Sequence, residues 1–518
     1  MKAIATIMKA AVLGLLSGSL NQVIAQTPAP RSTWVYQSAG GRLDYRHTKR
    51  GDRIMDFSAA GYMGGGVSLP DVKAIAIVYP MQGDNTASIQ RTIDSVARLP
   101  LVNSFRGAVL LAPGMFTCNG ELHLDSSGVV LRGSGPATKI VMSGAPHPCF
   151  SIGGPSTVER VGEAVSVTDA YIPSGADAFT VADAGELSAG DEIAIIKPVT
   201  PKWVHYMNMD VLVRDGKPQT WIKGELVTER TIEKIEGNRV SVSVPLTDSY
   251  DEMYTQPGIV IQRIERRRER SQIGLEDLSI IAPAQSVTIN QQHYAAIRTR
   301  GLADAWIRNI EILNTVNSIA ISGRRITVDR VQIRHTVPTI GAAKPADLAA
   351  NGAQLFFNKC TIQGDNVFYL ATGAKVSGPI VLLNCRFSGK GWIQPHQRWA
   401  TGLLIDGCTV ADGGIDFMNR GEMGSGHGWA IGWAVAWNCI AKSYLNQQPP
   451  GAYNWVIGSK GERMKKAMPF DKNPFLPEGT YDVHGKAVRP RSLYLAQLKD
   501  RLGEKALYNI GYSINKSF

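Results

Sequence analysis

The feature that most constrains the fold is a short strand phrase that recurs along the second half of the chain. Four copies, "FFNKCTIQG", "VLLNCRFSG", "LLIDGCTVADG" and "AVAWNCIAKS", carry a cysteine in the same place: Cys360, Cys385, Cys408 and Cys439. Three earlier copies carry an aliphatic residue there: Leu278, Ile310 and Val331. The successive intervals are 32, 21, 29, 25, 23 and 31 residues. A variable period in this range predicts a solenoid whose coils differ in loop length.

One short strand per coil explains why different apolar residues share this position. Adjacent coils stack at about 4.8 Å, so each coil adds one residue to a buried column that accepts interchangeable small hydrophobic groups, including a free thiol. Thiols on adjacent parallel strands rarely have the Cβ geometry of a disulfide, so we expect these four to be reduced. The remaining two cysteines, Cys118 and Cys149, are able to pair in an oxidising compartment, and the sequence leaves that open.

The rest of the chain is also rich in short strand signals. Runs such as "GAVLLAPG" and "SGVVLRGSG" are aliphatic and bounded by glycine, asparagine or aspartate, whereas long helical periodicity is nearly absent. The best early helix candidate is "DNTASIQRTIDSVARLP", in which Ile89, Ile93 and Val96 share one face. We therefore predict an all-β solenoid with this helix as a cover over its first coil, because an uncovered end would recruit other chains.

Changes of rhythm divide the chain into five parts. We predict a signal peptide over 1–25, an N-terminal cap and first coils over 26–154, and an inserted β-rich subdomain over 155–260. The main parallel β-helix is expected over 261–440, and an irregular C-terminal segment with a terminal helix over 441–518. The charged run "ERRRER" after the insert is interpreted as a solvated connection rather than a binding patch.

The first residues predict export. Lys2 and Lys9 precede and flank a short apolar run, and Val23-Ile24-Ala25 offers a small-residue cleavage site. That run is too short to span a bilayer, and no later stretch of about 18 apolar residues follows, so no membrane span is expected. The predicted location is therefore the periplasm or the exterior of the cell.

The net charge favours an acidic partner. Removal of the two signal lysines lowers the formal net charge from +11 to +9. No helix-turn-helix, zinc-finger or RNA-binding signature is present, so nucleic acid is not the expected partner. An exported basic protein more often meets acidic glycans, and we expect an acidic polysaccharide.

The N-terminal phrases carry a resemblance to a known superfamily. "GDNTASIQRTID", then "GAVLLAPGMFTCNGELHLDSSGVVLRGSG" and the later coils, resemble the pectate-lyase-like superfamily over about 56–145 and 273–440. The resemblance implies a right-handed parallel β-helix with an N-terminal capping helix and activity on carbohydrates. Polysaccharide lyases, glycoside hydrolases, epimerases and phage tailspike adhesins share that superfamily, so the site must decide the function. Calcium assists many of its lyases and is an optional cofactor here, but no compact acidic cluster identifies ligands for it.

Aligning the coils on their cysteines predicts a site. Equal offsets on adjacent coils lie side by side when the loops are similar, so His396 and Asn419, each eleven residues after a cysteine, are expected to be neighbours. Their contexts bring Arg398 and Arg420 to the same place, and the loop "NRGEMGSGHGW" adds His427. The expected substrate-binding residues are Asn419, Glu422, Trp392, Trp399, Trp429, Asp365 and Asp416, the tryptophans as platforms for a sugar ring. The five-residue offset places Asp365 beside Lys390.

These residue types suit β-elimination on a uronate-containing glycan. The arginines Arg398 and Arg420 are expected to neutralise the carboxylate, and His396 or His427, or else Lys390, to remove the proton. No further cofactor is required by this chemistry. A glycoside hydrolase is the first alternative, because Asp365, Asp412, Asp416 and Glu422 offer a carboxyl pair. A glycan-binding solenoid without catalysis is the second.

Overall fold

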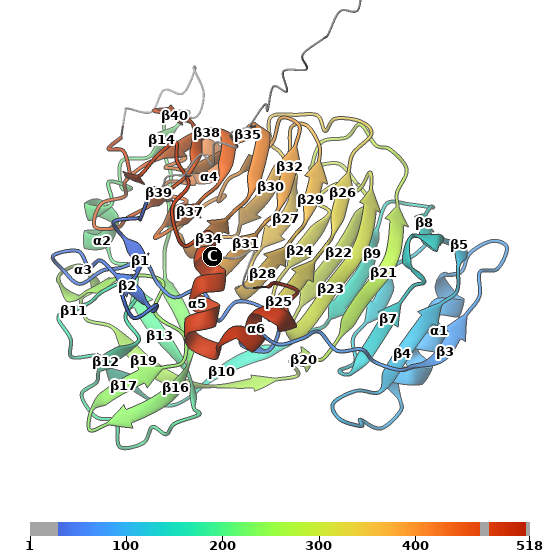
Figure 1. The fold of residues 1–518 in the computed structure, drawn as a ribbon, viewed down its shortest axis with the longest axis horizontal. Helices are drawn as coiled ribbons and strands as arrows, with labels where there is room; N and C mark the ends of the chain where they lie inside the picture. Colours follow the sequence, from blue (N-terminus) through green and yellow to red (C-terminus); the bar gives the residue numbers. More distant parts are fainter. Residues whose placement is uncertain (1–29, 467–475, 514–518) are drawn as a thin grey trace, which may run out of the picture.

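A computed structural model describes residues 30–466 and 476–513, so the predicted signal peptide lies outside the described residues. The chain forms a parallel β-helix in which 29 strands join one continuous network of parallel pairs (Figure 1). The predicted all-β solenoid is thus confirmed. Each coil contributes strands to three faces, which we call the first, second and third face in the order in which the chain passes through them.

The strands of each face follow the chain from the N-terminal to the C-terminal end of the solenoid. The first face contains β3 (Ala74–Val78), β4 (Gly107–Leu111), β7 (Val129–Arg132), the start of β21 (Gly274–Ile281), the middle of β23 (Leu302–Leu313), β25 (Arg324–Asp329), β28 (Ala353–Asn358), β31 (Ser377–Leu383), β34 (Ala400–Asp406), β37 (Val435–Trp437), β39 (Trp455–Ile457) and β41 (Thr480–Asp482). The second face contains β5 (Gly114–Cys118), β8 (Thr138–Met142), the ends of β21 and β23, β26 (Gln332–Arg334), β29 (Thr361–Gln363), β32 (Arg386–Ser388), and the starts of β35 (Thr409–Phe417), β38 (Ile440–Asn446) and β40 (Lys460–Met464). The third face contains β6 (Leu122–Leu124), β9 (Pro148–Gly153), β22 (Ala295–Arg300), β24 (Ile319–Ile321), β27 (Ala346–Ala350), β30 (Phe368–Thr372), β33 (Trp392–Ile393) and the ends of β35, β38 and β40.

The column predicted from the sequence phrase is confirmed at every step. Leu278 pairs with Ile310, and the registers on either side of the later frame residues continue the column through Val331 and the four cysteines. All four thiols are buried and free. Each lies 3.2–3.6 Å from a carbonyl oxygen of the preceding coil, for example Cys439 Sγ to Ile405 O at 3.2 Å. Cys118 and Cys149 are also free and buried in this structure.

The predicted early helix is present as α1 (Thr86–Ala97). Ile89, Ile93 and Val96 are buried in the main core, where the helix contacts β3, β4, β6 and β7. Its opposite side carries exposed polar groups such as Arg91 and Asp94. The helix therefore packs its apolar face against the core and leaves a polar outer surface.

An antiparallel sheet interrupts the solenoid between β9 and β20 (Arg270–Ser271). Its strands, in spatial order, are β10 (Thr157–Ser166), β19 (Val260–Arg267), β13 (Glu192–Pro198), β16 (Glu225–Glu236), β17 (Arg239–Val242) and β12 (Ala178–Thr180). Glu236 pairs with Arg239, so the chain turns at Gly237 and Asn238 as the sequence predicted. This insert also carries α2 (Pro201–Tyr206), α3 (Glu252–Thr255) and two short strand pairs, and it projects at the lower left of Figure 1.

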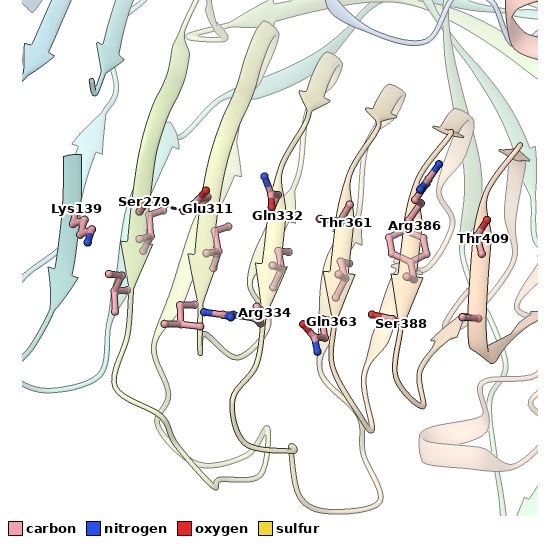
Figure 2. A pocket seen from close by; sticks show the side chains of 18 residues that line it. Lys139, Ser279, Glu311, Gln332, Arg334, Thr361, Gln363, Arg386, Ser388 and Thr409 are labelled. Atoms are coloured by element: carbon pink, nitrogen blue, oxygen red, sulfur yellow. Dashed lines mark hydrogen bonds between the residues drawn. The ribbon is translucent and has the colours of Figure 1, made fainter. Parts of the chain in front are cut away.

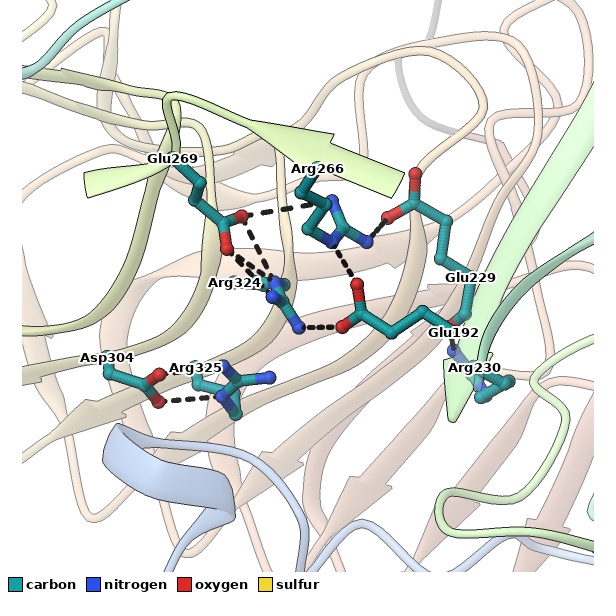
Figure 3. A network of polar contacts seen from close by, with 8 residues as sticks. All are labelled: Glu192, Glu229, Arg230, Arg266, Glu269, Asp304, Arg324 and Arg325. Carbon is teal, nitrogen blue, oxygen red and sulfur yellow. Dashed lines mark hydrogen bonds and ion pairs between the residues drawn. The ribbon is translucent and has the colours of Figure 1, made fainter. Parts of the chain in front are cut away.

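A network of ion pairs attaches the insert to the solenoid (Figure 3). Arg324 of β25 lies 2.6 Å from a Glu192 oxygen of the insert and 2.7 Å from Glu269. Arg266 contacts Glu192 at 2.8 Å and also Glu229 at 2.5 Å. Since Arg266 and Glu269 belong to "ERRRER" and are only 13% and 18% exposed, the interpretation of this run as a solvated connection is wrong for them. They join a partly buried network instead.

The solenoid extends further toward the C-terminus than predicted. Strands β38 to β41 continue the faces to Asp482, so the boundary at 440 was placed too early. The proline-rich loops between these strands concealed them in the sequence. Beyond them lie the terminal helices α5 (Leu493–Leu502) and α6 (Glu504–Asn509). Gly503 separates the two helices.

The terminal segments cover the first face. Outward side chains of β28, β31, β34 and β37 form an apolar cluster with Leu493, Tyr494 and Leu498 of α5 and with Phe57 from the N-terminal segment. Tyr494 stacks on Phe356 with ring centroids 4.8 Å apart. The first face is therefore covered over β28, β31, β34 and β37. No helix of the described residues is long and apolar enough to cross a membrane.

Candidate functional site

Four predicted residues converge at the corner between the third and first faces. His396 and Arg398 lie on the loop from β33 to β34, and Arg420 and His427 lie on the next loop, between β35 and β36 (Ile431–Gly432). The two imidazole rings meet edge to face with centroids 4.6 Å apart. We call these four residues the His–Arg cluster. The loop "NRGEMGSGHGW" is thus one wall of it.

Both histidines are uncharged at neutral pH. Burial, followed by the Arg420 and Arg398 guanidinium groups, lowers the pKa of His396 to about 4. Burial, the neighbouring His396 and then the arginines lower the pKa of His427 to about 3. The cluster thus disfavours any additional positive charge on either ring. The His427 Nδ1 atom is buried and has no hydrogen-bond partner among the described residues.

Arg420 lies at the centre of the cluster with an incomplete set of partners. Its Nη1 donates to Gln394 Oε1, and its guanidinium lies 5.6 Å from the centroid of the Phe368 ring. Gln394 in turn donates to Asp416 Oδ2 at 2.6 Å. The Arg420 Nε atom is buried and has no hydrogen-bond partner within residues 30–466 and 476–513. Burial lowers the pKa of Arg420 to about 10, which still leaves it charged at neutral pH.

Asp416 was predicted to bind the substrate, but its side chain is buried. It is 5% exposed and holds Gln394 from behind. Burial raises the pKa of Asp416 to about 6, against the opposing effects of Gln394 and Arg420. Its contribution is to orient Gln394 and, through it, Arg420.

Arg398 holds the loops together. Its Nε donates to the Trp221 carbonyl at 2.6 Å, and its Nη2 donates to Ser425 Oγ at 2.8 Å. The remaining nitrogen, Nη1, donates to the Gln397 side chain at 2.5 Å. The insert also reaches the cluster through Arg214, whose Nη1 donates to the Gly424 carbonyl at 2.5 Å. All three guanidinium nitrogens of Arg398 are therefore engaged by protein.

Close packing explains two glycines of the loop. A Cβ on Gly424 would lie 2.2 Å from His427 Nε2, and one on Gly428 would lie 2.3 Å from the Trp221 ring. Both residues also have positive φ, +61° and +55°. The glycines thus allow the insert and His427 to approach the loop backbone.

Asn419 does not face His396. Ile393 pairs with Ile415. Ile393 comes eight residues after Cys385, but Ile415 comes only seven residues after Cys408, so residues at the same distance from the two cysteines are out of register by one. A slip of one residue turns a side chain to the opposite side of a strand. Asn419 accordingly lines a different cavity of about 650 Å³, together with Glu422 and Trp429 and with Met207 and Met209 of the insert. Asn419 Oδ1 accepts from the Gly421 backbone N–H at 2.8 Å, and the predicted contact with His396 is not among the contacts of the described residues.

The tryptophans predicted as sugar platforms differ in exposure. Trp399 is 3% exposed and Trp429 is 2% exposed, and their indole N–H groups donate to Asp248 and to the Met207 carbonyl. Neither ring face is free for stacking, so the prediction for these two is wrong. Trp392 is half-buried and carries Lys344 Nζ 5.1 Å from its ring centroid.

Several residues near the cluster had no signal in the sequence. Lys344, whose pKa is lowered by burial and by Arg420, comes from a loop two coils earlier. Trp221 and Arg214 come from the insert, which shares no period with the coils. Phe368 and Gln394 were detectable in principle, because Phe368 lies on β30, which pairs with the strand of Trp392, and Gln394 lies two residues before His396.

The second face is open and forms a groove (Figure 2). The groove has a volume of about 750 Å³ and is lined by outward side chains from seven strands between β8 and β35. Stacking at about 4.8 Å gives these seven strands a span of roughly 29 Å along the axis. One row of side chains runs through Lys139, Ser279, Glu311, Gln332, Thr361, Arg386 and Thr409. The groove is long enough to hold an extended polymer.

Asp365 and Lys390 lie where the strands of this groove end. They follow the groove residues Gln363 and Ser388 by two positions, and Asp412 follows Ala411 on the next coil. The Lys390 backbone N–H donates to Asp365 Oδ1 at 2.6 Å, so the predicted pairing is observed. Asp365, Lys390 and Asp412 are exposed and lie on a different corner from the His–Arg cluster. The predicted residues therefore fall in three places: the His–Arg cluster, the cavity lined by Asn419 and the rim of the groove.

No three histidine, cysteine or carboxylate side chains are arranged to hold a metal ion within the described ranges.

Comparisons with known proteins add a likeness of fold. No model of a known family and no curated protein matches the chain. The tailspike protein gp49 from Pseudomonas phage LKA1 is 12% identical, with 73% of this chain and 69% of that chain covered and a TM-score of 0.37. A mutant tailspike protein of E. coli bacteriophage HK620 in complex with pentasaccharide is 10% identical, with 77% and 58% covered and a TM-score of 0.41. The A-module of mannuronan C-5 epimerase AlgE6 from Azotobacter vinelandii is 12% identical, with 79% and 74% covered and a TM-score of 0.29. Likeness at this level concerns the fold and does not identify a substrate or a reaction.

Proposed function

We propose that this chain is an exported lyase that cleaves an acidic, uronate-containing polysaccharide by β-elimination at the His–Arg cluster. One observation carries the proposal: two uncharged imidazoles lie in contact beside a charged guanidinium that has an unused N–H group. Elimination needs a cation that binds the uronate carboxylate and a base that removes the acidified C5 proton. Arg420 fits the first role and His396 the second.

Binding of the substrate would prepare the base. In the free protein, Arg420 and Arg398 lower the pKa of His396 through charge repulsion in addition to burial. A uronate carboxylate bound to Arg420 offsets that positive charge, so the pKa of His396 rises toward the value that suits proton abstraction. The imidazole is neutral before binding and thus already able to accept a proton.

The other residues have supporting roles. Arg398 positions His427 and the insert, because its guanidinium nitrogens are all engaged and its backbone N–H donates to the His427 carbonyl at 3.0 Å. Lys344 is the candidate acid for the leaving oxygen, since its Nζ lies 5.1 Å from the centroid of the Trp392 ring and burial and the charge of Arg420 lower its pKa. The proton removed from C5 goes to His396, and the proton from Lys344 goes to the departing oxygen.

A glycoside hydrolase is the second candidate, and a different observation favours it. The exposed carboxylates Asp365 and Asp412 lie two coils apart, with Lys390 on the coil between them, beyond the open groove of the second face. Hydrolysis uses two carboxyl groups on either side of the scissile bond. A glycan lying along the groove would bring its bonds to that rim.

Two matched variants separate these possibilities. The purified chain is incubated with a panel of acidic polysaccharides, with and without calcium, and new reducing ends are counted. The lyase proposal expects His396→Gln to lose at least about 100-fold in kcat, while Asp365→Asn stays within about twofold. The opposite pattern would support hydrolysis at the groove. Binding without new reducing ends, measured by glycan affinity electrophoresis, would identify a non-catalytic glycan-binding solenoid.

A further inference from the structure

The N-terminal end of the β-helix exposes an unusual amount of apolar surface. Eight of the 18 large apolar side chains that the described residues expose lie within residues 75–115. On strand β3, Ile75 is 47% exposed, Ile77 is 53% exposed, and the following Tyr79 is 67% exposed. The outer side of α1 is polar, so this apolar surface belongs to the strand and its neighbours and is not part of the helical cover.

Strand β3 is also an unpaired edge. Its only strand partner in the described part of the chain is β4, to which it is parallel. The Lys73 carbonyl accepts a hydrogen bond from Ala108 of β4 at 3.0 Å, and the Val78 carbonyl accepts one from Ala112, which directly follows β4, at 2.9 Å. Alternate residues of a strand direct their backbone groups to opposite edges, so the N–H and C=O groups of Ile77 and Tyr79 point away from β4. An exposed apolar edge of this kind recruits another strand unless charges or prolines block it.

We propose that a second copy of this chain pairs with β3, antiparallel and about a two-fold axis at Ile77. Ile77 would lie opposite the partner's Ile77, and Ile75 opposite the partner's Tyr79. The latter is an aromatic pair with a β-branched residue, which is favourable between strands. This proposal goes beyond the proposed function and does not depend on it.

The charges fit this self-pairing. Residues 74–83 contain no charged side chain, and the flanking Lys73 would lie opposite the partner's Met81. No like charges face each other in this register. A two-fold contact uses the same patch on both copies. The free edge of β3 in one copy pairs with the free edge of β3 in the other, so neither is left for a third chain.

The surroundings enlarge the contact. Ile75 packs against Gly107, next to the exposed Val102 hairpin, and Pro80 packs against Gly114, next to the exposed Met115. The strand pair would therefore be flanked by apolar side chains on both sides of the axis.

Light scattering with size exclusion tests the state of the chain. The purified protein is expected to have the mass of two chains, and Ile77→Lys the mass of one, because a lysine on the edge opposes its own copy. Ile440→Lys is the matched control: Ile440 is 52% exposed on β38, near the other end of the solenoid, and this variant should stay dimeric. Circular dichroism of each variant checks that it is folded.

A cysteine at the axis tests the register. Residues of a hydrogen-bonded antiparallel pair have Cα atoms about 5.5 Å apart, within the disulfide range. All six native cysteines are buried, so Ile77→Cys should give a covalent dimer on mild oxidation while Ala87→Cys, on the exposed side of α1, does not. A monomeric wild type, a dimer that persists in Ile77→Lys, or failure of Ile77→Cys to cross-link would each overturn the proposal.

Discussion

Asp248 should be among the most sensitive positions for stability, because it joins the insert to the coil that carries the His–Arg cluster. It is 5% exposed. Its Oδ2 accepts from Lys197 Nζ at 2.9 Å and from Trp399 Nε1 at 3.0 Å. Its Oδ1 accepts from Trp433 Nε1 at 3.0 Å and from the Ser249 backbone N–H at 2.9 Å. Lys197 belongs to the insert, whereas the two tryptophans belong to the solenoid.

The change Asp248→Asn removes a charge and one acceptor while keeping the shape. In one orientation of the amide its NH2 group faces the donors of Lys197 and Trp399, and in the other it faces those of Trp433 and Ser249. In either case two donors lose their acceptor. Lys197 is 4% exposed and would remain as a buried cation whose only other hydrogen bond to the described residues is with the Ser249 carbonyl, at 3.0 Å. Breaking a buried ion pair from one side costs about 3–5 kcal/mol. We expect a loss of that size in the free energy of unfolding.

Urea unfolding followed by tryptophan fluorescence measures the loss. The matched control is Asp177→Asn, whose carboxylate is 66% exposed and 3.9 Å from Arg53, so that its loss should cost at most about 1 kcal/mol. The double variant Lys197→Met with Asp248→Asn should recover part of the stability, because no buried cation remains. A cost below about 1 kcal/mol for Asp248→Asn would refute this reasoning.

Three further predictions follow from the core and the cluster. Burial raises the pKa of Asp406 to about 7. The contribution of its protonated side chain to stability is therefore fully present below about pH 4 and is lost as the pH rises through 7. Asp406→Asn should raise the melting temperature at pH 8 and leave it unchanged at pH 4. Burial, and then the arginines, lower the pKa of His396 to about 4. The contribution of the neutral imidazole to stability is therefore present above about pH 6.5 and is lost as the pH falls through 4. An NMR titration of His396 with a midpoint near 6.5 would contradict this. Cys385→Val should change the free energy of unfolding by less than about 1.5 kcal/mol, since the column already holds valine, whereas Cys385→Ser should cost about 1–3 kcal/mol as a buried hydroxyl.

The fold was readable from the sequence because one physical requirement repeats in every coil. Each coil must place an apolar residue on the column of the coil before, and the phrase around Cys385 repeats that requirement at Cys360 and Cys408. Strands β39 and β41 escaped detection because their phrases are only three residues long and are separated by proline-rich loops. Short strands take their stability from their neighbours and leave little local signal.

The candidate site was predictable only in part. His396 and His427 were placed together correctly, since their loops leave neighbouring coils at the same corner. Asn419 was misplaced because one extra residue between the second and third faces shifts the register by one. The contacts of Trp221 were not predictable, because the insert packs against the cluster without any repeat that relates the two sequences.

The mass of the products tests the central claim, elimination at the His–Arg cluster, most directly. Elimination leaves an unsaturated uronate at the new non-reducing end, so each such fragment is lighter by one water than the hydrolytic fragment of the same length. Mass spectrometry of a digested acidic polysaccharide is expected to find these lighter fragments with the wild-type chain and none with His396→Gln. Fragments of hydrolytic mass, or unsaturated fragments formed equally well by His396→Gln, would contradict the account.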